Sequence, residues 1–494
     1  MQSSPLPKDL AALHERVKTA VQAYGLDCFP VVFEMLDYDQ VNMVAAGGGF
    51  PTRYPHWRFG MDYDQLSKGY EWGMQKIYEM VINNDPCYAY LLNSNPYIDQ
   101  KLVMAHVYGH CDFFKNNYWF SKTNRKMMDQ MANHAVRIRR YMDKYGEDRI
   151  ENFIDRCLSV EDLIDPFLPF AEEKQENSVA EQIEESVGKF KAPRSYLENF
   201  MNPKDFLEKQ KNKLESKKKE QKQFPLQPQR DVLKFILEYA PMEDWQADVL
   251  SIVREEAYYF APQRTTKIMN EGWASYWHSK ILTEKLLEPS EFLDFADRHA
   301  GVMVTQAGNI NPYKLGIEMF RHIEDRWNKG KFGKDYDECD DMVQKKVWDK
   351  KLGLGKQKIF DIRKSHNDIT FIDEFFTEEF CEDQKLYTYE MNPRTKRYEI
   401  KTRDWKDVKE KILAGLTNAG RPLIKVVDGN FRNRSELLLK HEHHGQDLDL
   451  RYAKATLENL AYLWGRTAHL ETTNEGQKKI YSCTPQGEFS EDKS

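Results

Sequence analysis

The chain has 494 residues, of which 40% are hydrophobic and 13% aromatic, and a formal net charge of −7. This length exceeds what one hydrophobic core usually serves and predicts two or three domains. The charge excludes a large basic surface for nucleic acid or acidic lipid. We expect no signal peptide and no membrane span, because the N-terminus and the apolar stretches have neither pattern. The seven scattered cysteines include no Cys-x-x-Cys pair, which favours reduced thiols in a cytoplasmic protein.

The first 83 residues predict two helices separated by extended and irregular chain. Apolar residues recur at helical spacing over 5–24 and again over 63–83. Residues 29–36 read as a strand or an extended segment. The segment 45–60 is rich in glycine, proline and aromatic residues, and it lacks the Gly-Lys-Ser/Thr ending of a phosphate loop. We therefore favour an aromatic loop packed against the core over the alternative of a substrate-binding loop.

A helix is predicted from Pro96 to about residue 116, with Asn95 as its N-cap. His106 and His110 are one turn apart, so both rings can project from one face toward one metal ion. The surrounding residues are apolar nearly all round the helix, which indicates burial. Two buried histidines need polar partners. A metal ion would serve both, and so would separate hydrogen bonds to carbonyl and carboxylate groups.

The next 100 residues begin as helix and then change in composition. Residues 124–165 carry an apolar stripe at helical spacing, with His134 as a further candidate ligand or a structural histidine. From about 171 to 230 the sequence is dense in Lys, Glu and Gln. Such a segment buries too little apolar surface to offset its ordering entropy. We interpret it as a charged insertion within the first domain.

A second polar motif lies on the predicted helix at 265–280. Glu271 and His278 lie seven residues apart on one face of this aromatic-rich helix. Gly272, inside the helix, costs about 1 kcal/mol relative to alanine. That cost predicts a close approach to another helix.

Glu271 is expected to be buried, and a buried carboxylate needs a counter-charge. One source is a metal ion shared with His106 and His110. The other is an arginine, either Arg254 or Arg264.

After Phe371 the pattern changes to alternating strands and helices. We expect strands at 385–390 and 397–401, a helix at 404–417, a hairpin over 422–441 and a helix at 449–465.

The fold class is therefore mainly α, with a large helical core domain at 1–370 and a small C-terminal α+β domain at 371–494. The metal motif makes the core a candidate for a zincin-like domain. His441, His443 and His444 form a tip that we expect to be solvated rather than metal-binding.

Several of these motifs resemble the stage V sporulation protein R (SpoVR) family. The resemblance covers nearly the whole chain, including Asn270-Glu-Gly-Trp-Ala-Ser-Tyr-Trp-His278 and Asn311-Pro-Tyr-Lys-Leu-Gly316. Its other stretches are 50–60, 77–90, 105–117 and 448–472. The resemblance implies a role in spore cortex (peptidoglycan) formation, although the family also occurs in bacteria that do not sporulate. It also implies partners, namely a PrkA-type serine kinase and a von Willebrand A-like protein.

Two classes of function follow. In the first, His106, His110 and Glu271 bind zinc in a hydrolase that cleaves an amide bond, with a peptidoglycan precursor as its target. Glu271-Gly-Trp-Ala274 resembles the third-ligand helix of gluzincin-type zinc peptidases. However, Val107 occupies the position of their general base.

Another residue would then have to act as base, and the sequence does not choose among Glu255, Glu256, His134, Tyr108 and His278. In the second class the protein is a non-catalytic scaffold or regulator. Its histidines hold the core together, and its C-terminal domain recruits partners.

Overall fold

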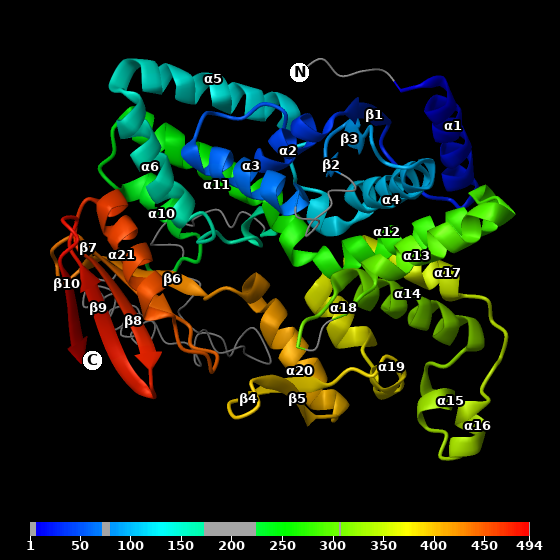
Figure 1. Ribbon diagram of the computed structural model, residues 1–494. Coiled ribbons are helices and arrows are strands. Elements are labelled where there is room, and N and C mark those ends of the chain that lie inside the picture. Colours follow the sequence, from blue (N-terminus) through cyan, green and yellow to red (C-terminus); the bar gives the residue numbers. More distant parts are fainter. Residues whose placement is uncertain (1–5, 72–79, 172–223, 306–307, 494) are drawn as a thin grey trace, which may run out of the picture. The chain divides into compact units, whose positions relative to one another are not determined.

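The computed structural model describes residues 6–71, 80–171, 224–305 and 308–493 (Figure 1). The chain divides into two compact units, each built from two segments of the sequence. The first unit comprises Met1–Asp155 and Glu255–Arg421, and the second comprises Arg156–Arg254 and Pro422–Ser494. Across the described ranges, no helix combines the length and apolar composition that crossing a bilayer requires.

The first unit is mainly helical, as predicted. Its helices are α1 (Lys8–Ala23), α2 (Tyr38–Ala46), α3 (Trp57–Glu71), α4 (Tyr97–Asn116), α5 (Met127–Tyr145), α12 (Lys267–Ile281), α13 (Phe292–Val302), α14 (Pro312–Lys329), α15 (Lys334–Asp337), α16 (Met342–Lys346), α17 (Gly355–Ser365), α18 (Asp368–Phe375), α19 (Glu378–Asp383) and α20 (Trp405–Leu416). Two more helices, α6 (Glu147–Ser159) and α11 (Asp244–Thr265), run across the division between the units.

A small sheet lies beside α1 and α4 (Figure 1). Its strand order is β1 (Val31–Leu36), β3 (Cys87–Leu92) and β2 (Met80–Ile82). β1 and β3 are parallel, and β2 is antiparallel to β3. Helix α2 follows the carboxyl end of β1, and helix α4 follows the carboxyl end of β3. A separate hairpin joins β4 (Thr388–Asn392) to β5 (Arg397–Thr402).

Three helices of the first unit pack with their backbones in contact. A methyl group built on Gly272 of α12 would lie 2.4 Å from Cα of Gly316 on α14. One built on Gly109 of α4 would lie 2.6 Å from Cα of Ala274 on α12. The close approach predicted from Gly272 is confirmed, and glycine is required on α4 and α14 as well. Around these contacts Trp273 and other large side chains are fully buried in one core.

The second unit holds a five-stranded sheet. The strand order is β10 (Phe489–Lys493), β9 (Gln477–Cys483), β8 (Ala468–Asn474), β7 (Glu436–His441) and β6 (Ile424–Phe431). β7 and β8 are parallel, and the helix α21 (Leu450–Trp464) connects them, while the other neighbouring pairs are antiparallel. The unit also contains α10 (Val232–Tyr239).

Several local expectations differ from the structure. Residues 80–82 form β2 rather than the end of a helix, because Met80–Ile82 pairs with Tyr88–Tyr90. Pro96, not Asn95, is the N-cap of α4, and no side chain caps this end. Gly146, at a φ of 93°, separates the helix expected at 124–165 into α5 and α6. His441 is buried and bonded to Thr472, so the tip is not solvated at that residue.

The compact units also divide at a different place from the expected domains. Helices α18 to α20 belong to the first unit, where Phe371, Phe375 and Ile412 join the same core as α4. The predicted boundary near residue 371 therefore falls within a continuous core. Most of the predicted charged insertion at 171–230 lies outside the described residues. Within its described end, Gln229 pairs with Val426.

The glycine contacts give a direct test of the packing. Gly272→Ala should lower the free energy of unfolding by about 1–3 kcal/mol, because its methyl group would press on the α14 backbone. Gly301→Ala on α13 is the matched control, since nothing lies within 4 Å of its added methyl group. It should raise the free energy of unfolding by up to about 1 kcal/mol. Urea denaturation measures both changes, and equal effects would contradict the close contact.

Candidate metal centre

The fold brings together the three residues predicted as metal ligands. His106 and His110 project from α4, and Glu271 projects toward them from α12. Oε2 of Glu271 lies 3.7 Å from Nε2 of His106 and 3.5 Å from Nε2 of His110. All three donor atoms lie within 4.8 Å of one another. The two histidines are buried, and the Glu271 side chain is 17% exposed.

The other ring nitrogens of the two histidines are held by neighbouring side chains. Nδ1 of His110 lies 2.9 Å from Oδ1 of Asn270. An amide oxygen only accepts, so Nδ1 of His110 donates, and Nε2 is the ring nitrogen directed at Glu271. Nδ1 of His106 lies 2.7 Å from Nδ1 of His278. Such partners fix ring orientation in the way that outer contacts do around bound metals.

The arrangement places a ring nitrogen close to a carboxylate oxygen. Nε2 of His110 lies 3.5 Å from Oε2 of Glu271. Oε2 of Glu271 is buried, and it accepts no hydrogen bond from any residue in the described part of the chain. Such an arrangement is unfavourable unless a cation or a proton lies between the atoms.

The donor set fits zinc. Histidine nitrogen and carboxylate oxygen bind zinc at about 2.0–2.2 Å, which in tetrahedral geometry places ligand atoms about 3.3 Å apart. The observed separations of 3.5 and 3.7 Å are close to that value. The arginine alternative loses support at Arg254, which pairs instead with Asp231 at 2.7 Å.

Two buried carboxyl groups position the helices of the centre. Asp368 accepts hydrogen bonds from the backbone N–H groups of Ile268 and Met269, both at 2.9 Å, and so caps the start of α12. Its burial raises its pKa to about 7. Asp112 of α4 accepts a hydrogen bond from the Trp273 indole at 2.8 Å, which ties α4 to α12. Burial raises the pKa of Asp112 to about 6.

Of the predicted catalytic residues, His278 reaches the centre. It contacts His106 through Nδ1, and its Nε2 lies 3.2 Å from Nδ1 of His299. Three imidazoles therefore form a chain leading away from Glu271. Burial, Arg321 and His106 lower the pKa of His299, which favours its neutral form.

Tyr108 lies on the other side of α4. Its hydroxyl group is 2.7 Å from Nε2 of His14 on α1. Two residues along a helix correspond to a rotation of about 200°, so Tyr108 cannot share the face of His106 and His110. Burial also raises the pKa of Tyr108 well above its ordinary value.

Glu255 and Glu256 belong to a separate ionic cluster with His134 and Arg53. Glu256 pairs with Arg53 at 2.7 Å and with Nδ1 of His134 at 3.0 Å. Glu255 lies 3.3 Å from the other ring nitrogen of His134. Burial lowers the pKa of His134, but its hydrogen bonds to Glu255 and Glu256 outweigh this effect and raise it. The charges of the cluster compensate one another locally, which is typical of a structural network.

Three residues near the centre were not predicted. Asn270 precedes Glu271 directly, but an amide is not a usual zinc ligand, so the ligand pattern did not identify it. His299 is distant in sequence from both motifs. The ring of Tyr313 lies 6.2 Å from the ring of His106, and its only sequence signal was its place in a family-like motif.

Comparisons with known proteins cover both units. The family model described as SpoVR like protein matches residues 6–421, and the model described as SpoVR-like C-terminal domain matches residues 422–475. The chain is similar to a protein of Escherichia coli (strain K12) described as uncharacterized protein YcgB. The two are 29% identical over 489 residues, which cover 93% of this chain and 91% of the relative. No solved structure matches the chain.

The raised pKa of Asp368 predicts a dependence of stability on pH. An aspartate in an unfolded chain titrates near pH 3.9, whereas the native group titrates near pH 7. Between these values the native state binds more protons than the unfolded state, so the free energy of unfolding should fall as pH rises from about 4 to about 7. Asp368→Asn, which cannot titrate, should remove this component of the decrease.

Urea denaturation at about pH 5 and about pH 8 measures the effect. The exposed Asp361→Asn on α17 is the matched control and should keep the wild-type pH dependence. An unchanged pH dependence in Asp368→Asn would show that Asp368 is already ionised at pH 5 in the native protein.

Proposed function

Because the chain belongs to the SpoVR family, we propose that it takes part in spore cortex formation as a zinc-dependent hydrolase. The ligands are His106, His110 and Glu271, and the target is an amide bond in a peptidoglycan precursor. The family association supports the cortex role. The cytoplasmic location expected from the cysteines suits a precursor better than finished wall.

One observation carries the metal proposal. Oε2 of Glu271 and Nε2 of His110 converge across 3.5 Å in a buried setting. Asn270 accepts a hydrogen bond from Nδ1 of His110 and so orients the ring with Nε2 toward Glu271, where a cation would bind both atoms. The ligand set is zincin-like in this sense, with two histidines one turn apart and a glutamate from a second helix.

The chain's own residues would have separate roles around a bound zinc ion. Zinc, when bound here, would lower the pKa of a water molecule toward about 7. His278 acts as a positioning residue, because it holds the ring of His106 at 2.7 Å. Tyr313 lies beside His106 and is the candidate to contact substrate.

A scaffold acting with a PrkA-type kinase and a von Willebrand A-like protein is the second candidate. It is favoured by Val107, which is fully buried and replaces the general base of zinc peptidases. It is favoured also by Tyr108, Glu255 and Glu256, whose polar groups are engaged outside the centre. In this alternative the zinc would only join α4 to α12.

The metal proposal predicts about one zinc per chain in the purified full-length protein. Glu271→Gln, which preserves volume, and His110→Ala should both lose it, and His278→Phe should bind zinc about 10- to 100-fold more weakly. His441→Ala removes a buried histidine of the other unit and should keep the metal. Elemental analysis after zinc loading and dialysis measures the content. A metal-free wild type that is as stable as these variants would refute the site.

The hydrolase proposal predicts cleavage of an amide bond in a peptidoglycan precursor stem peptide. Mass spectrometry of the products should show cleavage by zinc-loaded protein and a loss of about 100-fold or more in Glu271→Gln. Glu255→Gln should cleave at the wild-type rate, because Glu255 belongs to the His134 cluster. Zinc-loaded wild type that binds metal but cleaves nothing would favour the scaffold.

A further inference from the structure

The hairpin of β4 and β5, which lies beside α20 (Figure 1), has an exposed apolar face. In its register Tyr389 lies opposite Ile400, and Met391 lies opposite Tyr398. These four side chains share one face, because successive side chains of a strand point to opposite faces. Met391, Tyr398 and Ile400 are each between 42% and 54% exposed. A cluster of exposed apolar side chains marks a surface that another molecule covers.

A loop adjoins this apolar face. A methyl group built on Gly308 would lie 3.5 Å from Cδ1 of Tyr398, so the chain before α14 contacts the hairpin. Ile310 follows Gly308 by two residues and is exposed. Two residues of chain span about 7 Å at most, so Ile310 adds an aliphatic side chain near the ring of Tyr398. The loop and the hairpin therefore form one apolar surface.

The turn of the hairpin is cationic. The chain as a whole has a net charge of −7, but residues 385–403 contain six basic and two acidic residues. Three of the basic residues lie at the turn between the strands, namely Arg394, Lys396 and Arg397 (the turn cations). Within the described ranges, none of these three side chains has an ion pair or a hydrogen bond. Their charges are therefore available to an anionic partner.

The two acidic residues of the hairpin lie on its other face. Glu390 and Glu399 are opposite each other in the register, between the two apolar pairs. Oε1 of Glu399 accepts hydrogen bonds from Asn392 at 2.9 Å and from Thr395 at 3.0 Å. Glu390 pairs with Lys401 across 3.6 Å. The apolar face therefore has the turn cations at its end and no carboxylate of the hairpin on it.

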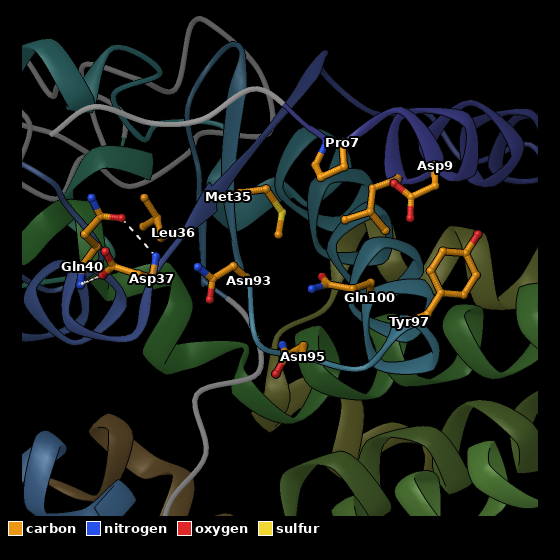
Figure 2. A pocket seen from close by; sticks show the side chains of 11 residues that line it. Pro7, Asp9, Met35, Leu36, Asp37, Gln40, Asn93, Asn95, Tyr97 and Gln100 are labelled. Carbon is orange, nitrogen blue, oxygen red and sulfur yellow. Dashed lines mark hydrogen bonds between the residues drawn. The ribbon is translucent and has the colours of Figure 1, made fainter.

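The shape of the hairpin end indicates what kind of partner fits. All residues from Pro393 to Lys401 are exposed, on both strand faces, so this end is convex. A convex element suits a broad surface rather than a ligand that a pocket must enclose. The cavity in Figure 2 is of the second kind, and its lining, from the ends of β1 and β3 and the starts of α1, α2 and α4, includes no residue of this hairpin.

We propose that the β4–β5 hairpin binds the surface of an anionic membrane. The turn cations would bind lipid phosphates, and Met391 and Ile400 would enter the boundary between the headgroups and the acyl chains. Tyrosine is favoured at that depth, because its ring is apolar and its hydroxyl group is polar, and this suits Tyr398. Nucleic acid would also offer phosphates, but no apolar medium for aliphatic side chains. This surface does not depend on the metal centre or on the function proposed for it.

Co-sedimentation of the full-length protein with lipid vesicles tests the proposal. Phosphatidylcholine vesicles that contain one third phosphatidylglycerol should bind the protein with half-saturation below about 1 mM lipid. Pure phosphatidylcholine vesicles should bind it at least about tenfold more weakly, because they offer the turn cations no net charge. Raising the salt concentration from about 0.1 M to about 0.5 M should weaken binding to the anionic vesicles. His110→Ala should bind them like the wild type, which separates this surface from the metal centre.

The triple variant Arg394→Gln, Lys396→Gln, Arg397→Gln tests the charges. It should weaken binding to the anionic vesicles about 100-fold, since each basic residue near an anionic surface contributes about fivefold in affinity. All three positions are exposed, so thermal denaturation should show an unchanged fold.

A second triple variant is the matched control, namely Arg139→Gln, Arg140→Gln, Lys144→Gln on α5. It removes the same charge from exposed positions of another element, and it should bind the anionic vesicles like the wild type. Equal losses in the two triple variants would show a response to net charge alone and would refute the assignment to the hairpin.

The apolar contact has its own test. Met391→Ser and Ile400→Ser should each weaken binding to the anionic vesicles about five- to tenfold, because each removes apolar area that the membrane would bury. The loss should persist at about 0.5 M salt, where screening suppresses the contribution of the charges. Val343→Ser, at an exposed apolar residue of α16, is the matched control and should have no effect.

Two results would overturn the proposal. One is the absence of binding to the anionic vesicles at about 1 mM lipid. The other is tighter binding to a polyglutamate peptide, measured by fluorescence anisotropy, than to the vesicles, which would assign the surface to an acidic protein partner instead.

Discussion

The contact of α12 with α4 on one side and α14 on the other constrains the first unit more than any other feature. At Gly109, Gly272 and Gly316 the backbones are too close for any side chain. This spacing brings Glu271 of α12 opposite the histidines of α4, at 3.5 and 3.7 Å. A larger residue at Gly109 would separate α4 from α12 and widen the centre, and one at Gly272 or Gly316 would separate α12 from α14. Gly109 is therefore part of the site, although it contributes no polar atom to it.

The buried polar groups of the unit fall into two classes, according to whether the protein supplies their counter-charge. Asp112 is compensated by Arg363 and by the Trp273 indole, and Glu256 by Arg53 and His134. These groups have their counter-charges and donors within the protein. Glu271 differs, because its closest charged or ionisable partners are imidazoles and its Oε2 accepts no hydrogen bond among the described residues. A buried carboxylate in that condition is where an external cation is expected.

Local sequence signals predicted the elements of the centre well and its surroundings poorly. The spacing of His106 and His110, the burial of their helix and the close approach at Gly272 all follow from one-dimensional patterns, and each is confirmed by the structure. The roles of Tyr108 and Glu256 depend on which helix lies opposite, and no local pattern contains that information. For the same reason the sequence did not predict that the core continues through Phe371. The residues of α4 and α14 in the same core lie far from Phe371 in sequence.

Val107 shows why the metal motif and the catalytic motif separate in this chain. In zinc peptidases the residue after the first histidine is the general base and must reach the substrate side of the metal. Here position 107 is fully buried among the apolar residues of the core. A glutamate there would be a second buried carboxylate without a counter-charge. Any general base in the proposed centre therefore has to come from a position other than 107.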